Sequence, residues 1–316
     1  MKVSFNRTPP SGPWGGGASF VDNMSKFLIS AGHDVIFHLE RDVDVIFMID
    51  PRHSDGGYSI NEIAHYKSLF PGTKIIHRIN ECDKRKGTSF IDSLLLSSNE
   101  IADETVFISK WLQKYFKESG FSKESHVVYN GCDSNFFFKK NNSNINDKLK
   151  VITHHWSDNW MKGFDIYSKI DQYLDNHDDF EFTYVGRYSK EYTPSNTRIV
   201  SPLSGMKLGE EIRKHDIYVT ASRFEPCGMH HVEGSSCGLP VLFHEDGGGI
   251  NELCINHGEQ FKNFEEFLSC LDKVKNEYSS YVDKIDSSFL TSDRCCGEYE
   301  EIILNLLGGS ENNERI

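Results

Sequence analysis

The sequence has little of what a membrane protein or a nucleic-acid-binding protein needs. No apolar run approaches the roughly 20 residues that a membrane-spanning helix requires. The first residues develop no apolar signal-peptide core, because polar residues and two prolines follow Phe5. Positive charge is scarce as well: the formal net charge is −13 at pH 7, whereas a nucleic-acid binder needs a strong basic patch. We therefore expect a cytoplasmic protein with no transmembrane segment and no nucleic-acid partner, and a peripheral membrane contact stays open.

Metal-binding spacings are missing from the sequence too. None of the eight cysteines forms a Cys-x-x-Cys pair, and only Cys295 and Cys296 are close together. Zinc sites need such spacings, and scattered cysteines are typical of reduced thiols in the cytosol. The adjacent His154 and His155 do not change this expectation, because neighbouring side chains on a strand point in opposite directions. We expect neither a metal nor a cofactor.

Strand-like and helix-like segments alternate along most of the 316 residues. This alternation predicts an α/β protein with parallel sheets, and the length suits two domains. The clearest break in composition is the polar, Asn-rich stretch 139–147, which we interpret as the linker. The sequence therefore predicts a first Rossmann-like domain over 1–140, a second over 149–287, and a terminal helix within 288–307.

The most informative stretch is 221–240, which contains two carboxylates, Glu225 and Glu233, with seven residues between them. Glu225 follows an apolar, strand-like run, and Glu233 lies in the first turns of a predicted helix that stops near Gly238 and Pro240. The loop between the two glutamates is therefore at the carboxyl end of a strand, where ligands bind in open α/β sheets. The amino end of a helix in this place offers free N–H groups to a phosphate.

This stretch resembles the donor-site signature of retaining glycosyltransferases of the family 4 type, in which a pair of glutamates is followed by a helix of small residues and Gly-x-Pro. The resemblance implies the GT-B fold, in which two Rossmann-like domains face a central cleft and the C-terminal helix crosses back to the first domain. Further segments resemble the family in the same order along the chain, namely the glycine loop at 15–17, Asn130-Gly131, Lys162-Gly163 and Gly247-Gly248.

The resemblance implies roles for several residues of the second domain. Glu225 would contact hydroxyls of the transferred sugar, and Glu233 would bind the ribose diol of the nucleotide, since a carboxylate accepts two O–H bonds at once. Lys162 would stabilise the charge that grows on the leaving diphosphate. The arginine that usually precedes this lysine is replaced by Trp156, so Arg187, or histidines and backbone amides, would have to supply the second positive charge.

Further donor contacts are implied around these residues. A glycine loop after the first strand would let the backbone approach the donor diphosphate. The backbone amides that follow Glu225 would reach the sugar or the phosphates. The donor-binding residues that we expect are Gly16, Gly17, Arg187, Cys227, Gly228, Met229, His230 and Glu233.

The acceptor is expected over the first domain. A strand of the buried type is predicted over 74–78, and a dense polar stretch over 77–88 continues from its end. Family members carry a functional histidine in a comparable loop, so the resemblance implies a sugar-binding or proton-accepting role for His77. Arg78, Asn80 and Asp83 are the expected acceptor-binding residues. A solvated, charged loop is the alternative interpretation of this stretch.

The predicted activity is the transfer of a hexose from a nucleotide sugar to an acceptor hydroxyl, with retention and without a metal. Glu225, Lys162 and His77 are the predicted catalytic residues. The acceptor stays open between a glycan, a lipid-linked molecule, a protein and a small molecule, and so do the nucleotide base and the sugar. Two interpretations compete with this one: a sugar-nucleotide epimerase or glycosidase of a similar fold, and a catalytically degenerate protein that binds a sugar or a nucleotide.

Overall fold

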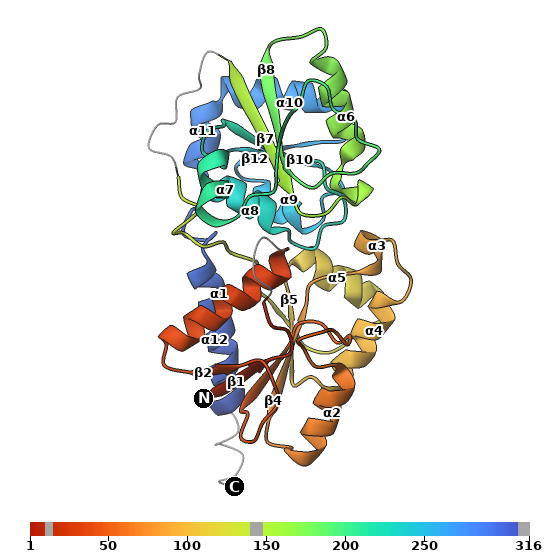
Figure 1. The fold of residues 1–316 in the computed structure, drawn as a ribbon, viewed down its shortest axis with the longest axis vertical. Coiled ribbons are helices and arrows are strands. Elements are labelled where there is room, and N and C mark those ends of the chain that lie inside the picture. Colours follow the sequence, from red (N-terminus) through yellow and green to blue (C-terminus); the bar gives the residue numbers. More distant parts are fainter. Residues whose placement is uncertain (10–14, 140–147, 309–316) are drawn as a thin grey trace. The chain divides into compact units, whose positions relative to one another are not determined.

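The computed structural model describes residues 1–9, 15–139 and 148–308, and these form two compact units (Figure 1). The division falls after Tyr129, earlier than the predicted boundary at residue 140. The physical reason is that Asn130 already donates to the carbonyl of Cys227, at 2.6 Å, within the second unit. Almost all of the predicted linker lies outside the described residues, whereas the glycine loop at 15–17 lies within them. In the described ranges, the first unit contains 1–9, 16–129 and 292–308, and the second contains residue 15, 130–139 and 148–291.

The first unit is built on a six-stranded sheet with the order β2-β1-β3-β4-β5-β6. All of its strand pairs are parallel, as the alternation of strands and helices predicts. The order reverses between β1 and β3, so the chain leaves these two neighbours in opposite directions. The strands are β1 (Lys2–Phe5), β2 (Asp34–Ile36), β3 (Val45–Met48), β4 (Lys74–Ile79), β5 (Glu104–Phe107) and β6 (His126–Val127).

Helices cover both faces of this sheet (Figure 1). Side chains alternate between the faces of a strand, and β3 shows the result. Val45 and Phe47 pack into the core under α1 and α12, whereas Ile46 and Met48 pack into the core under α2. The helices of this unit are α1 (Gly16–Ser30), α2 (Ile60–Leu69), α3 (Asp83–Lys86), α4 (Ile91–Ser98), the 3₁₀ helix η1 (Asn99–Ile101), α5 (Lys110–Glu118) and α12 (Ser292–Gly308).

The terminal helix α12 belongs to the first unit, as predicted, although the chain reaches it only after completing the second unit. It packs against α1 (Figure 1) through Tyr299, whose ring is fully buried. The ring centroid of Tyr299 lies 4.9 Å from that of Phe20 and 5.8 Å from that of Phe47. At 17 residues α12 is a long helix, but neither it nor any other helix in the described ranges is long and apolar enough to span a membrane.

The second unit contains another six-stranded sheet, with the order β12-β11-β10-β7-β8-β9. Its strand pairs are also parallel. Counted from the first strand of the unit, this is the 3-2-1-4-5-6 order of Rossmann folds, which reverses between β7 and β10. The strands are β7 (Leu149–His155), β8 (Phe180–Gly186), β9 (Arg198–Val200), β10 (Ile217–Thr220), β11 (Val241–His244) and β12 (Gly258–Phe261).

Two apolar cores lie on the two faces of this second sheet. Val151 of β7 joins the core under α6, α10 and α11, and its neighbour Ile152 joins the core under α7, α8 and α9. Odd and even residues of β7 therefore face different helices. The helices are η2 (Trp160–Lys162), α6 (Phe164–Tyr173), α7 (Gly205–Ile212), α8 (Met229–Ser236), α9 (Gly249–Cys254), α10 (Phe264–Asn276) and α11 (Tyr278–Asp283).

Replacing Tyr299 tests the docking of α12. We expect Tyr299→Ala to lower the free energy of unfolding by about 3–5 kcal/mol, because it removes a buried aromatic ring and leaves a cavity between α1 and α12. Urea unfolding measures the change. The exposed Glu301, on the same helix, provides the control, since Glu301→Ala is expected to change stability by about 0.5 kcal/mol or less. Equal effects of the two substitutions would contradict this account of α12.

Candidate functional site

The candidate site of the second unit lies where the strand order reverses, at the adjacent carboxyl ends of β7 and β10. The two strands pair in register, with Ile217 opposite Val151 and Tyr218 opposite Ile152. The chain leaves β7 through the loop 156–163 toward β8, and leaves β10 through the loop 221–228 toward β11. Loops that diverge in this way open a crevice that binds ligands in α/β proteins. Lys162 lies in the first of these loops and Glu225 in the second. Glu233 lies in α8, which follows the second loop.

Lys162 and Glu225 form an ion pair in this place. The distance from Lys162 Nζ to Glu225 Oε2 is 2.7 Å, and the two side chains are only 11% and 13% exposed. Lys162 ends the 3₁₀ helix η2, whose first turn Asn159 caps by accepting a hydrogen bond from the amide of Met161. Gly163 then turns the chain with φ +95°, and a Cβ on it would lie 2.2 Å from that of Ala221. Glycine is therefore required for the loop of Lys162 to approach the loop of Glu225.

The loop that carries Glu225 is tied to its neighbours on both sides. Arg223 forms two hydrogen bonds to the carboxylate of Asp165, at 2.9 and 2.7 Å, and its amide donates to the carbonyl of Met161. On the other side, the amide of Phe224 donates to Asp246, and the carbonyl of Glu225 accepts from Gly249. Phe224 has φ +53°, a strained value for a residue with a Cβ. These bonds hold the strained turn, and they fix the direction of Glu225.

Glu233 has a different partner, which the motif did not predict. Its Oε2 lies 2.7 Å from Nε2 of His154, the residue before the end of β7. The other ring nitrogen of His154 lies 3.1 Å from the hydroxyl of Tyr218 on β10. As expected for adjacent residues on a strand, His155 points elsewhere, and its Nε2 lies 2.9 Å from the hydroxyl of Tyr167 on α6. The two histidines are therefore divided between the two faces of the sheet.

Two more buried histidines, His230 and His231, follow in the first turn of α8. Nε2 of His230 lies 2.9 Å from the hydroxyl of Thr220, and burial, with His155 nearby, holds the pKa of His230 well below its usual range. His231 is fully buried with no hydrogen-bond partner for either ring nitrogen among the described residues, and burial lowers its pKa to about 3. Both rings are therefore neutral at pH 7. In the ranges that the structure describes, no group of three or more His, Cys, Asp or Glu side chains is arranged to hold a metal ion.

The remaining predicted donor residues of this unit lie directly after β8 or in the connection that follows β10. Gly228 caps α8, and a Cβ on it would lie 2.5 Å from the ring of His230 and 3.1 Å from Cγ of Glu225. Met229, the first residue of α8, is buried. Cys227 is buried and offers its carbonyl to Asn130. Arg187 directly follows β8 with an exposed side chain, and its amide donates to the carbonyl of His155.

In the first unit, His77 and Arg78 lie inside the sheet and not in a loop. Strand β4 continues to Ile79, so both residues are part of it and both are fully buried. Nδ1 of His77 lies 2.9 Å from the side-chain oxygen of Asn99, and burial lowers the pKa of His77 to about 4. Arg78 places its guanidinium carbon 4.0 Å from the centre of the Phe20 ring. Both residues thus belong to the strand that the sequence predicts over 74–78, and the loop begins only after Ile79. The catalytic role of His77 stays a prediction.

Asn80 and Asp83 do follow β4, but they differ in what they contact. A Cβ on Gly17 would lie 3.6 Å from the amide nitrogen of Asn80, so the structure brings these two predicted residues together at the amino end of α1, which Gly16 begins. Asp83 accepts hydrogen bonds from the hydroxyl of Thr88 and from the amides of residues 90–92. Burial alone would raise the pKa of Asp83, and these hydrogen bonds lower it below its usual range. Its side chain thus has a structural role in shaping the loop.

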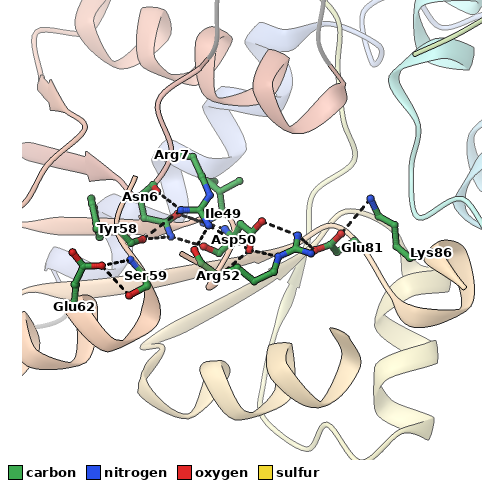
Figure 2. A network of polar contacts seen from close by, with 10 residues as sticks. All are labelled: Asn6, Arg7, Ile49, Asp50, Arg52, Tyr58, Ser59, Glu62, Glu81 and Lys86. Carbon is green, nitrogen blue, oxygen red and sulfur yellow. Dashed lines mark hydrogen bonds and ion pairs between the residues drawn. The ribbon is translucent and has the colours of Figure 1, made fainter. Parts of the chain in front are cut away.

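A charged network occupies the carboxyl ends of β1, β3 and β4 in the first unit (Figure 2). Arg52 binds both oxygens of Asp50, at 2.8 and 2.7 Å, and reaches Glu81 at 2.5 Å. Arg7 lies 3.5 Å from Asp50, and Lys86 lies 3.4 Å from Glu81. This is the point at which the order of the first sheet reverses, between β1 and β3. The sequence did not predict the contacts among these residues, because their segments are far apart in the sequence.

Part of this chain matches a known protein family: residues 135–266 match Glycosyl transferases group 1. A probable sucrose-phosphate synthase of Thermosipho melanesiensis is 25% identical over 199 residues, which cover 56% of this chain and 46% of that protein. The chain thus spans less than half the length of this curated relative.

Among solved structures, sucrose-phosphate synthase from Thermosynechococcus elongatus has a TM-score of 0.74 at 12% identity, over 98% of this chain and 100% of that one. Anabaena HepE in complex with UDP-glucose has a TM-score of 0.73 at 16% identity, over 96% and 99% of the two chains. Residues 135–266 are therefore similar to a group 1 glycosyltransferase domain, and the chain has the GT-B fold that the sequence predicted. The narrower assignment to family 4 stays a prediction.

The close approach at Gly163 gives a prediction about stability. We expect Gly32→Ala to lower the free energy of unfolding by about 1–2 kcal/mol, because Gly32 has φ +85° and open space around it. Gly163 has a similar φ, and the new methyl group of Gly163→Ala would also collide with Ala221. This substitution should therefore lower the free energy of unfolding by at least about 2 kcal/mol more than Gly32→Ala. Urea unfolding of the two variants measures the difference. Equal losses would contradict the tight packing of η2 on the loop after β10.

The buried His231 gives a prediction about pH. The unfolded side chain takes up a proton near pH 6.5, whereas the folded one resists protonation until about pH 3, so the stability that His231 contributes above pH 6.5 is lost as the pH falls between these values. Between pH 7 and 4.5, His231→Leu should therefore lose about 3 kcal/mol less unfolding free energy than the wild type. Urea unfolding at both pH values is the measurement. The exposed His65, changed to Leu, is the control and should follow the wild type.

Proposed function

We propose that this chain, whose residues 135–266 match the family Glycosyl transferases group 1, transfers a hexose from a nucleotide-sugar donor to an acceptor hydroxyl with retention of the anomeric configuration. The observation that carries the proposal is the convergence of Lys162, Glu225 and Glu233 at the reversal between β7 and β10, inside the matched segment. A nucleotide sugar presents hydroxyls, which carboxylates bind, and a diphosphate, which a cation binds. These three side chains supply both kinds of contact.

The ion pair between Lys162 and Glu225 would serve the reacting end of the donor. Glu225 would accept hydroxyls of the sugar. Lys162 is held 2.7 Å from Glu225 and would therefore lie beside the bond that joins the sugar to the diphosphate. The charge on the diphosphate grows as this bond breaks, so a fixed ammonium stabilises the transition state more than the ground state. Because the pair is held in place before the donor binds, little reorganisation is needed.

Further positive charge must come from elsewhere, because Lys162 and Glu225 together carry no net charge and Trp156 carries none. The amino end of α8 at Gly228 would contribute backbone N–H groups and the positive end of the helix dipole. Arg187 would add a full charge from the end of β8, where its side chain is exposed. With these groups a metal would not be required, and the leaving phosphate would take the proton of the acceptor on the same face of the sugar, which gives retention.

As the donor we propose a uridine diphosphate sugar, and UDP-glucose is the first compound to test. The support is analogy with a neighbour of the same fold, Anabaena HepE, which has been solved in complex with UDP-glucose. Glu233 would bind the ribose of the nucleotide.

For the acceptor we propose a sugar hydroxyl on a glycan, a lipid-linked molecule, a protein or a small molecule, bound through the first unit. The supporting residues are Asn80, which follows β4 beside Gly17, and the cations Arg52 and Lys86 nearby at the carboxyl ends of the strands.

Transfer from UDP-glucose to a panel of sugars, sugar phosphates and glycosides tests the proposal. We expect UDP release that depends on the acceptor, a product with the anomeric configuration of the donor by NMR, and full activity in EDTA. Lys162→Ala should lower kcat by about 10²–10³-fold, because it removes a group that stabilises the transition state. The exposed Lys207, changed to Ala, should leave kcat unchanged.

Other outcomes separate the alternatives. A changed sugar in the absence of any acceptor would identify an epimerase, and hydrolysis of a glycoside without a nucleotide would identify a glycosidase. If no nucleotide raises the melting temperature of the protein, donor binding is excluded, since a ligand that binds only the folded state must stabilise it.

A further inference from the structure

We propose that His154 is a positioning residue that orients Glu233. One carboxylate oxygen of Glu233 accepts a hydrogen bond from His154, and the other oxygen is left to bind the nucleotide ribose. The inference rests on the proposed function, because it concerns the nucleotide site, and it adds a residue that the glutamate motif does not contain. The motif spans residues 225–240, whereas His154 lies 79 positions before Glu233 in the sequence. Only the pairing of β7 with β10 brings the two side chains together.

The hydrogen bonds around His154 are consistent with a single tautomer. The backbone amide of His154 donates to the hydroxyl of Tyr218, at 3.1 Å. That hydroxyl can then donate its own proton to Nδ1 of the imidazole, also at 3.1 Å, which is closer than its other acceptor, the carbonyl of His154 at 3.4 Å. Nδ1 accepts, so Nε2 carries the proton and donates it to Oε2 of Glu233, at 2.7 Å. The hydrogen bonds therefore run in one direction, from the hydroxyl of Tyr218 to the imidazole of His154 and from the imidazole to the carboxylate of Glu233.

The surroundings hold this chain of hydrogen bonds rigid. The side chain of His154 is 4% exposed, and Tyr218 is completely buried. Gly234 allows α8 to lie directly on the ring of Tyr218, because a Cβ at this position would come within 2.5 Å of the ring. The small residues of α8 thus bring Glu233 down to the level of the strands. An imidazole held on both nitrogens has a fixed plane, and the carboxylate that accepts from it is fixed in turn.

The arrangement has a consequence for the ligand. In the described part of the chain, His154 is the side chain that donates to Glu233, and it uses Oε2. Oε1 is then the oxygen offered to the ribose, and it can accept from one hydroxyl with good geometry. Glu233 remains 13% exposed, enough to meet a ligand, whereas His154 is almost covered. His154 therefore acts through Glu233 and not by touching the nucleotide.

Binding of UDP and of 2′-deoxy-UDP, measured by calorimetry, tests the inference. We expect the wild type to prefer UDP by roughly tenfold or more, as for a hydrogen bond to a charged group. His154→Asn places its amide too far from Glu233 to replace Nε2, and should reduce the preference to about twofold while the affinity for 2′-deoxy-UDP changes little. His154→Gln can place an N–H near the position of Nε2, and should restore most of the preference.

The matched control is His215→Asn. His215 is a buried histidine of the same unit that bonds to Thr183 and to the carbonyl of Glu211, away from Glu233, so this variant should keep the preference of the wild type. A purely structural loss in His154→Asn would weaken the two nucleotides equally, and that result would overturn the inference. If Glu233→Ala abolishes the preference and His154→Asn keeps it, the inference fails and the proposed function stands. If the wild type binds no nucleotide, both fail.

A measurement on the wild type covers the case in which His154→Asn does not fold. The ¹⁵N chemical shifts of His154 report which ring nitrogen carries the proton. We expect the proton on Nε2, as the bond to Glu233 requires. A proton on Nδ1 and none on Nε2 would leave Glu233 without its donor and would overturn the inference.

Discussion

The donor site depends on the way the loop after β10 is held between two neighbouring connections. Arg223 ties it to Asp165 at the start of α6, and the loop after β11 holds the backbone of Phe224 and Glu225. Without these bonds the positive φ of Phe224 would relax, and Glu225 would leave Lys162. A nearly buried ion pair contributes little net stability, because desolvation offsets its attraction. The Lys162–Glu225 ion pair instead contributes to binding, because its charges are held in a fixed orientation before a ligand arrives.

Much of the second unit could be predicted from the sequence, because the signals were local. The alternation of strands and helices gave the parallel sheets. The spacing of Glu225 and Glu233, together with the lysine and glycine at 162 and 163, gave three groups that the structure gathers at one reversal of strand order. The divergence of His154 and His155 followed from strand geometry alone. Each of these conclusions needs only the neighbours in the chain and the rule that ligands bind at the carboxyl ends of strands.

The features that could not be predicted depend on contacts between distant segments. His154 meets Glu233, and Arg52 meets Glu81, only after the strands have paired, and nothing in either local sequence announces the partner. The burial of His77 and Arg78 depends on distant contacts too. Arginine is almost never fully buried unless it is paired, and nothing in the strand itself indicates a partner. The sheet buries both side chains, one against Asn99 and the other on the ring of Phe20.

The position of α12 has a consequence for the order in which the protein forms. The second unit is almost continuous in sequence, from Asn130 to Thr291, whereas the first unit takes its last helix from residues that follow. During synthesis, the second unit can therefore close its sheet and both of its cores while the first unit still lacks Tyr299. The apolar face that α1 and β3 present at Phe20 and Phe47 stays open to water, and to chaperones, until α12 has been synthesised. Of the two units, the one that begins first is thus completed last.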